Sequence, residues 1–314
     1  MTTISKLFNI TYPIVQGGMI WCSGWRLASA VSNAGGLGLI GSGSMTPDVL
    51  TEHIRKCREA TSKPFGVNIP LLFSYAETFV KICIAEKVPV VFTSAGNPVR
   101  WTATMKDNGI NVAHVVANEK GARKCVEAGV DAIVVEGFEA GGHNGKEETT
   151  TMVLVPLIRQ QTELPLIAAG GIGSGQAMLA AFALGADGVQ IGSLFAAAEE
   201  SSAHPHFKQK IMEAREGDTF LCMKKLVPVR LLNNHFYQEV QKLEQQGAPA
   251  EKISALLGRG RARKGMFEGD IDEGELEIGQ VAAAIQQIKP VQNIIDTLIQ
   301  DFLAGKNKLS GISF

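Results

Sequence analysis

The sequence is poor in the residues that would indicate a disulfide framework or a thiolate metal site. Its 314 residues include five cysteines, an odd number, and no two of them have the C-x-x-C spacing of zinc and redox motifs. Histidines are also few, and His204 and His206 flank Pro205 without a neighbouring cluster of carboxylates or cysteines. We therefore predict a reduced chain without a metal site.

Long apolar runs and an excess of charge of either sign are also missing. No run approaches the roughly 20 residues that a membrane-spanning helix needs, and the N-terminal MTTISKLFNI lacks the charged and apolar regions of a secretory signal. The formal net charge is -1, so no overall field attracts nucleic acid or an anionic membrane. These absences lead us to expect a cytoplasmic protein with no nucleic-acid or membrane partner.

The sequence does contain a series of short apolar segments, most of which end in glycine or a small polar residue. Because these segments are continuously apolar rather than alternating, we interpret them as parallel strands covered by helices on both faces. Helical periodicity follows several of them, as at 24–34, 46–60, 119–128 and 175–184. The eight strands are expected at 13–18, 37–42, 64–69, 89–95, 111–116, 132–137, 164–171 and 188–193.

Eight such units predict an α/β fold of the (β/α)8 type, a TIM barrel. An open doubly wound sheet is the alternative, but it usually carries one glycine-rich fingerprint at its first crossover, whereas here glycines end strand after strand. The repeat stops after Ser193, and residues 203–265 are interpreted as a small, mainly helical second domain inserted after strand eight. We assign 1–202 and 266–314 to the barrel and expect amphipathic helices from Leu276 onward.

Glycines after the seventh and eighth strands have the arrangement of a barrel phosphate site. Gly170 and Gly171 follow one strand, and Gly192 and Ser193 follow the next. Their backbone N–H groups lie where such barrels bind phosphate. A tight turn without a ligand would explain either pair alone, but two such turns at these two strands favour a ligand.

Residues after the first and third strands indicate a flat ring beside that phosphate. Gly17 and Gly18 allow close backbone approach, and Met19 offers an apolar surface. Asn68 carries both a donor and an acceptor for a ring with alternating N and C=O groups, and Gln190 could serve in the same way. A planar heterocycle with a terminal phosphate matches FMN, which we expect as the cofactor.

The stretch EGFEAGGHNG, residues 136–145, follows the sixth strand and so lies over the same barrel mouth. Its glycines weaken regular structure but let the loop fold tightly against a bulky ligand. His143 is the side chain there that exchanges a proton near neutral pH. A surface imidazole in a flexible loop is the alternative, but a place after a barrel strand favours a catalytic His143.

Eight motifs together resemble those of the nitronate monooxygenase-like FMN flavoproteins. They are QGGM, AGGLG, GVNI, SAGNP, EGFEAGGHNGK, AAGGI, GVQIGS and AHPHFK, in the expected order from residue 13 to about residue 208. Within that family they look most similar to bacterial FMN-dependent enoyl-(acyl-carrier-protein) reductases, because nitronate-oxidising relatives tend to have Gln at the place of Glu136 and Arg at that of Asn144. The resemblance implies His143 as the key catalytic side chain and FMN bound by Gly17, Gly18, Met19, Asn68, Gly170, Gly171, Gly192 and Ser193.

The resemblance also implies a reaction and its partners. NADH or NADPH would reduce a trans-2-enoyl thioester carried on acyl-carrier protein in fatty-acid elongation. The alternative within the family is FMN- and O2-dependent oxidation of an alkyl nitronate, and a third hypothesis is a flavin-binding module without catalysis. The reductases are associated with activation by a monovalent cation, for which Glu136 is a possible ligand. A homodimer is the commonest oligomer and our expectation.

Positive charge is concentrated between residues 206 and 265. This segment has seven lysines and five arginines against five glutamates and one aspartate. Its densest basic run is GRGRARKG, residues 258–265. Such a run is most often a solvated loop, and the alternative is a docking surface for an acidic partner or for the anionic tail of a substrate.

Overall fold

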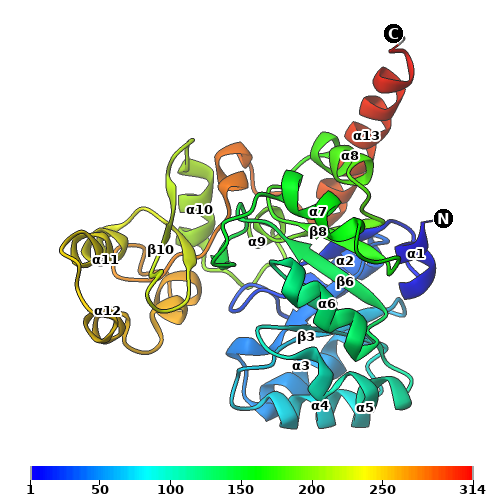
Figure 1. The fold of residues 1–314 in the computed structure, drawn as a ribbon, viewed down its shortest axis with the longest axis horizontal. Helices are drawn as coiled ribbons and strands as arrows, with labels where there is room; N and C mark the ends of the chain where they lie inside the picture. The colour runs from blue at the N-terminus through cyan, green and yellow to red at the C-terminus, as the bar shows by residue number, and fades with distance from the viewer. Residues whose placement is uncertain (1, 313–314) are drawn as a thin grey trace.

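Eight parallel strands form the centre of the fold, which the computed structural model describes for residues 2–312 (Figure 1). Their order around the sheet is β1-β9-β8-β6-β5-β4-β3-β2. A parallel bridge between Val15 and Leu37 joins the two end strands and closes the barrel. The predicted (β/α)8 barrel is thereby confirmed. The strands are β1 (Ile14–Gln16), β2 (Gly38–Gly41), β3 (Phe65–Pro70), β4 (Val90–Ser94), β5 (Asn111–Val116), β6 (Ala132–Glu136), β8 (Leu166–Ala169) and β9 (Gly188–Ile191).

Helices between the strands cover the outside of the barrel. Several begin at side-chain caps, in which Thr46, Asn118 and Ser174 each accept a hydrogen bond from a backbone N–H of the first turn. These caps fix where each helix starts, so the predicted helices at 46–60, 119–128 and 175–184 are confirmed. The helices are α1 (Thr3–Phe8), α2 (Trp25–Asn33), α3 (Pro47–Ala60), α4 (Ala76–Ala85), α5 (Thr102–Asp107), α6 (Glu119–Ala128), α7 (Thr151–Arg159), α8 (Gly175–Ala183) and α9 (Ser193–Ala196), with 3₁₀ turns η1 (Ser42–Ser44) and η2 (Pro98–Arg100).

Apolar side chains pack in two layers, one inside the barrel and one between the strands and the helices. Val15, Leu39, Phe92 and Val134 belong to the inner cluster, to which α1 also contributes apolar side chains. The outer cluster joins the opposite faces of the same strands to the surrounding helices. Burial on both faces is the reason that the strands are continuously apolar in sequence.

The segment after β9 is mainly helical, as predicted, but it also contains a β-hairpin that the sequence analysis missed. In Figure 1 its yellow part lies beside the barrel. β10 and β11 pair antiparallel, and β11 pairs further with β7, a two-residue strand of the loop after β6. Strands of four residues or fewer are too short to show a clear alternation. The elements are β7 (Gly142–His143), α10 (Pro205–Glu213), β10 (Thr219–Cys222), β11 (Val229–Leu232), α11 (His235–Gln245) and α12 (Ala250–Leu257).

We call β10, β11, α11 and α12 the cap. Its own apolar cluster includes Leu231, Phe236, Val240 and Ile253. A second cluster, with Phe207, Ile211, Leu232 and Leu276, joins α10 and β11 to the C-terminal part of the chain. The domain boundaries at 202/203 and 265/266 stay a prediction.

The expectation of helices from Leu276 onward is wrong for its first part and confirmed for its last. Glu277 forms an antiparallel bridge with Leu231 of β11, so the chain there is extended. Gly279 then precedes the short 3₁₀ turn η4 (Gln280–Ala284), and a π-helical turn, η3 (Arg263–Phe267), lies before this segment. Pairing with β11 replaces the helix that the apolar spacing predicted. α13 (Val291–Ser310) is helical and packs on α8, with the rings of Phe182 and Phe302 5.7 Å apart.

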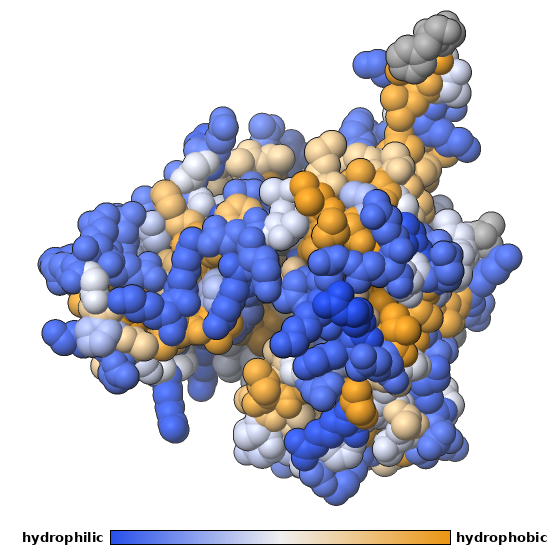
Figure 2. Space-filling view, in the orientation of Figure 1, coloured by the Kyte–Doolittle hydropathy of each residue, from blue (hydrophilic) through white to orange (hydrophobic). Residues whose placement is uncertain are grey.

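The visible face is mostly polar, with apolar side chains in several separate groups (Figure 2). Figure 2 shows hydrophilic side chains over most of the cap and a group of apolar side chains over α7. Met152 and Val153 on that helix are 70% and 53% exposed. None of the helices in residues 2–312 combines the length and the apolar character needed to span a bilayer. The predicted homodimer and the cytoplasmic location stay predictions.

Candidate functional site at the barrel mouth

A buried glutamine holds the loop after β1 in place. The side chain of Gln16 has no exposed surface, and its Nε2 donates to Gly17 O and to Ser23 Oγ, the latter at 2.8 Å. Ser23 Oγ donates to Gly17 O at 3.0 Å and accepts from Met19 N at 3.0 Å. Gly17 N donates to Ile191 O at 2.9 Å. Both backbone groups of Gly17 are therefore engaged in the protein, and the sequence analysis missed Gln16 and Ser23, although a polar residue in an apolar strand was a signal.

Gly18 lies directly against Asn68 of β3. A Cβ atom on Gly18 would come within 2.2 Å of Asn68 Cβ, so a larger residue does not fit without a shift. Asn68 Nδ2 donates to Gly18 O at 3.4 Å, and the side chain is 9% exposed. This contact brings the ends of the first and third strands together at the mouth, as the prediction of a shared ring site requires.

The ends of β8 and β9 present a group of free backbone donors. The N–H groups of Gly170, Gly171, Gly192 and Ser193 donate to no backbone or side-chain acceptor within residues 2–312. Gly170 and Gly171 have φ values of 91° and 68°, the left-handed region that favours glycine. The two strands are neighbours, with Ala169 opposite Gln190. Four free donors on adjacent loops fit a phosphate group.

Space for a ligand lies above Gly192. A Cβ atom placed there would meet only Met19 Sδ, at 3.6 Å, which is an ordinary contact. The Ser193 hydroxyl accepts a hydrogen bond from Gly279 N at 3.0 Å, so its own hydrogen can still be donated. Gln190 forms no side-chain hydrogen bond within the described part of the chain. The residues present thus fit a cofactor that carries a phosphate and a polar ring.

The loop after β6 is fixed by the cap hairpin. His143 pairs with Val229 of β11, and Asn144 N donates to Pro228 O at 2.8 Å. The side chain of His143 is exposed. Glu148 forms an ion pair with Lys224, which ties the far end of the loop to the hairpin turn. The structure therefore brings His143 to the edge of a sheet, whereas the sequence predicted a loop.

Gly141 and Gly142 are required by close packing. A Cβ atom on Gly141 would lie 2.4 Å from the backbone carbon of Ile278. Gly142 has φ 75°, and a Cβ atom there would lie 2.5 Å from the carboxylate of Glu277. β11 and the segment 275–279 therefore hold this glycine-rich loop between them. This agrees with the prediction that the surrounding fold, and not the loop's own residues, makes the loop rigid.

Two further residues brace this loop, and the sequence analysis assigned neither. Arg230, which is 2% exposed, donates through Nε and Nη2 to Phe138 O at 3.2 and 3.0 Å and lies 4.4 Å over the Phe138 ring. Burial lowers the pKa of Arg230. Glu139 accepts from Thr151 N, at 3.1 and 3.0 Å, and from Thr151 Oγ1 at 3.0 Å. Glu139 therefore anchors the start of α7, and Arg230 is no part of the cationic surface.

Three carboxyl groups near the mouth bind their protons unusually tightly. Burial raises the pKa of Glu136, at the end of β6, to about 7. Burial, followed by the neighbouring Glu277, raises the pKa of Glu275 to about 8. The pKa of Glu277 is raised to about 7, also by burial. Carboxyl groups with pKa values near neutrality are uncommon and gather at functional sites.

These pKa values predict a protein that is less stable in alkaline than in mildly acidic solution. A carboxyl with a raised folded pKa stabilises the fold below its unfolded pKa of about 4.3, and this contribution is lost as pH rises through about 7 to 8. We expect Glu275→Gln to raise Tm by roughly 2–5 °C at about pH 9 and to leave it nearly unchanged at about pH 5. Thermal unfolding at the two pH values measures this. Glu147→Gln, an exposed carboxylate, is the control, and an equal Tm change at both pH values would contradict the prediction.

The other histidines do not reach the mouth as proton-exchanging groups. His114 is buried, and its Nδ1 lies 2.7 Å from Thr93 Oγ1. Burial lowers its pKa to about 4, so the ring is neutral at physiological pH, as expected for a satisfied core residue. His204 and His206 pack their rings 4.6 Å apart. Within residues 2–312, no three His, Cys, Asp or Glu side chains are grouped as metal ligands.

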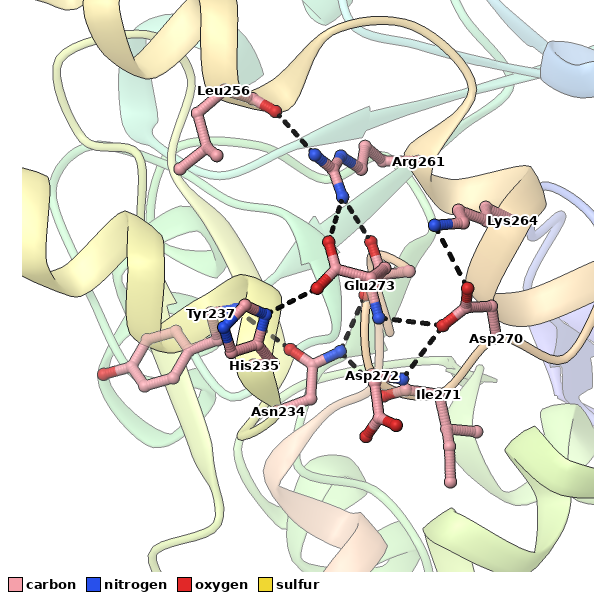
Figure 3. A network of polar contacts seen from close by, with 11 residues as sticks. Asn234, His235, Tyr237, Leu256, Arg261, Lys264, Asp270, Ile271, Asp272 and Glu273 are labelled. Carbon is pink, nitrogen blue, oxygen red and sulfur yellow. Dashed lines mark hydrogen bonds and ion pairs between the residues drawn. The ribbon is translucent and has the colours of Figure 1, made fainter.

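Most basic side chains of the run 258–265 form ion pairs with carboxylates of the same chain. Figure 3 shows Arg261, whose Nη1 donates to Glu273 O at 2.7 Å and contacts the Glu273 carboxylate at 3.0 Å. The Arg261 guanidinium also lies 4.8 Å over the Phe236 ring. Two more ion pairs are Lys264 with Asp270 at 3.1 Å and Arg263 with Glu268 at 2.9 Å. Arg261 is therefore largely covered and committed to Glu273, whereas Arg263 stays exposed beside Glu268, and Arg259 is exposed and forms no ion pair within the described residues.

A closed (β/α)8 barrel with free backbone donors after β8 and β9, and polar and apolar groups after β1 and β3, is the architecture of a barrel flavoprotein. The chain belongs to the nitronate monooxygenase family, whose family model matches residues 1–78 and 74–301. Members of this family are FMN-dependent oxidoreductases.

Individual relatives span more than one activity. The solved structure of FabK from Thermotoga maritima is 44% identical and covers 99% of each chain with a TM-score of 0.95. A nitroalkane oxidase from Streptomyces ansochromogenes is 26% identical over 98% of this chain and 99% of its own, with a TM-score of 0.84. A probable nitronate monooxygenase from Bacillus subtilis is 31% identical, covering 96% of this chain and 99% of its own length. A hydroxy-oxo-indene-carboxyl-CoA dehydrogenase from Rhodococcus jostii is also 31% identical, over 96% of this chain and 95% of its own.

Proposed function

We propose that this protein is an enoyl-(acyl-carrier-protein) reductase, which reduces trans-2-enoyl thioesters in fatty-acid elongation with NADH or NADPH and FMN. The observation that carries the proposal is the 44% identity to FabK, an enoyl-acyl-carrier-protein reductase, over 99% of both chains. The relatives named for nitronate or nitroalkane oxidation are 31% and 26% identical. A coenzyme A thioester in the name of the Rhodococcus relative also supports a thioester substrate.

The residues of the barrel mouth would hold FMN in two parts. FMN, when bound, supplies a ring that transfers a hydride between the pyridine nucleotide and the substrate. The four free N–H groups after β8 and β9 would bind its phosphate, because no acceptor in residues 2–312 engages them. The proposed ligands are Gly170, Gly171, Gly192 and Ser193 for the phosphate, and Gly17, Gly18, Met19, Asn68, Glu136 and Gln190 around the ring.

His143 would supply the proton in this reaction. Reduction of the double bond develops negative charge on the thioester oxygen, and that charge needs a nearby N–H donor or acid. His143 is exposed and its backbone is anchored by β11, so the imidazole is held at the mouth while its ring stays accessible. We assign it the role of stabilising the enolate and protonating it.

Oxidation of alkyl nitronates is the second candidate function, favoured by the family and by the Bacillus relative. The side chain of Asn144 supports the reductase instead. Its Nδ2 donates to Ala140 O at 2.8 Å and to Gly142 O at 3.2 Å, so it braces the loop behind His143. An arginine, which the nitronate-oxidising relatives tend to have here, is too long to make the same short contacts. A flavin-binding module without catalysis leaves the placing of His143 unexplained.

The carrier protein, the cation and the dimer belong to the proposal as well. An acidic carrier protein would meet exposed cap cations such as Arg259 and Lys252, which form no ion pair within residues 2–312. Glu136, a half-buried carboxyl at the end of β6, would be the ligand of any activating monovalent cation. A homodimer is proposed from the general frequency of dimers.

One comparison of substrates tests the function. We expect the purified yellow protein to contain FMN and to oxidise NADH or NADPH with a crotonyl thioester, and to turn over an alkyl nitronate far more slowly. A carrier-protein thioester should have a lower KM than the small thioester at low salt. That advantage should shrink above about 0.15 M salt, where the screening length is about 8 Å. Faster turnover of the nitronate would establish the second candidate instead.

A further inference from the structure

His143 and the two carboxyl-bearing residues Glu277 and Glu275 lie in line along one edge of β11. His143 and Gly142 pair with the first two residues of that strand. The next two positions are taken by a distant part of the chain, where Glu277 forms an antiparallel bridge and Leu276 O accepts a hydrogen bond at 2.9 Å. Residues 275–277 and 142–143 therefore form one composite strand. Because side chains alternate along a strand, His143, Glu277 and Glu275 fall on the same face of it.

The two carboxyl groups of this composite strand form no side-chain hydrogen bond or ion pair within residues 2–312. Glu275 is 8% exposed and Glu277 is half-buried. No fully buried side-chain oxygen in the described part of the chain lacks a partner, so both carboxyl groups keep some contact with solvent. A largely desolvated carboxylate without a partner cation is disfavoured in its charged form, and two carboxylates side by side on one strand face oppose each other's ionisation.

The surroundings of the pair contain little positive charge. Glu275 faces Glu277, His143 and Arg261, and it also lies near the Cys222 thiol. Arg261 is already paired with Glu273, and Glu277 has the Cys22 thiol as a further neighbour. Burial raises the pKa of both thiols to about 12, so neither gives up its proton near neutral pH. Among the groups named here, His143 is therefore the partner with which the pair could exchange a proton.

We propose that Glu275 and Glu277 hold one shared proton and serve as the proton reserve of His143. This inference rests on the proposed reduction of enoyl thioesters. When a ring N–H of His143 protonates the substrate α-carbon, an N–H bond breaks and a C–H bond forms. The ring nitrogen then takes the proton of the pair, whose O–H bond breaks, and water returns one proton to the carboxylate. One proton enters per turnover, the same number that reduction of the double bond consumes.

Infrared spectroscopy over a pH titration tests the stored proton without turnover. We expect a protonated-carboxyl C=O band in the wild type at about pH 6 that disappears between about pH 7 and 9. The double variant Glu275→Gln/Glu277→Gln should lack this band, which separates it from the contribution of Glu136. The ring NMR signals of His143 should show a change over the same range in the wild type that is missing from the titration of the double variant.

Kinetics test whether the reserve is used. Glu277→Gln should lower kcat for a crotonyl thioester by about 10-fold with KM nearly unchanged, as expected for a group that acts on proton transfer. Glu277→Asp, which keeps the acid, should restore most of the rate and the pH dependence. Glu147→Gln, an exposed carboxylate of the loop after His143, is the matched control and should behave as the wild type.

Several results would overturn the proposal. These are no band difference between wild type and double variant, no response of His143 to the titration, or an unchanged kcat and pH profile in Glu277→Gln. Removal of the band by Na⁺ or K⁺ at constant ionic strength would mean that the pair binds a cation instead of a proton. If the double variant does not fold, Glu277→Gln alone provides both readouts. Absence of thioester turnover in every form, wild type included, would overturn the proposed function while the spectra still decide whether the proton is stored.

Discussion

His143→Ala should retain FMN but lose turnover of a crotonyl thioester by roughly 10²- to 10⁴-fold, the usual contribution of a general acid–base group. Retention of FMN is expected because His143 lies on β7, paired with the cap hairpin, and not on the loops after β8 and β9 that carry the free donors. Its side chain is exposed, so its removal leaves no cavity and should leave Tm nearly unchanged. Stopped-flow measurement of the oxidative half-reaction isolates the step in which the proton is used.

Two controls give this result its meaning. His235→Gln removes an exposed histidine of the cap and should turn over substrate as the wild type does. Equal loss of FMN and of activity in His143→Ala would indicate damage to the mouth rather than to proton transfer. A near wild-type rate for His143→Ala would assign the proton to water or to another residue.

Gly192→Val should fold normally and lose at least about 10- to 100-fold in FMN affinity. The physical reason is that a Cβ atom at Gly192 meets only Met19 Sδ, at 3.6 Å, so the protein itself has room for a side chain. The backbone conformation there, with φ -101°, is also open to any residue. The new side chain would instead occupy the space proposed for the phosphate, and loss of one or more hydrogen bonds to a charged group costs about 1.5–3 kcal/mol each.

Fluorescence titration of the cofactor-free protein with FMN measures this affinity. Gly311→Val is the matched control, because Gly311 also has an ordinary φ of -89° and an ordinary contact, at 3.6 Å, but lies at the end of α13. Unchanged FMN binding by a folded Gly192→Val would place the phosphate elsewhere. A loss of Tm in the protein without cofactor would show that the glycine serves the fold.

Most of the barrel could be predicted from the sequence, because its strands are local features. Each is an apolar run of three to six residues with glycine or a small polar residue near its end. Helices such as α6 start at a capping Asn118 and end at Gly129 with φ 70°. Gly170, Gly171, Gly192 and Ser193 could be located in the same way. The carboxyl ends of neighbouring parallel strands must lie together once the barrel is known.

The hairpin of the cap and the segment after Leu276 could not be predicted in this way. A strand of four residues within a helical segment is too short to show the alternation of apolar and polar residues that identifies strands. Glu277 is part of a sheet only because its backbone pairs with the free edge of β11, which is distant in sequence. The position of Arg261 could not be predicted either. Its place in a basic run suggested an exposed side chain, but its guanidinium lies over the Phe236 ring and binds Glu273.

By itself, the sequence determined the order of strands and helices in the barrel, the glycine-rich barrel mouth and the prediction of His143 as the catalytic residue, because each depends on residues close together in the chain. Only the tertiary structure decided what surrounds His143. Val229 and Glu277 reach its strand from distant parts of the chain, through hydrogen bonds between backbones that have no sequence signature. Burial of Glu275 and Glu277 beside each other then raises their pKa values, and this effect comes from loss of water around the carboxyl groups, which no local pattern encodes.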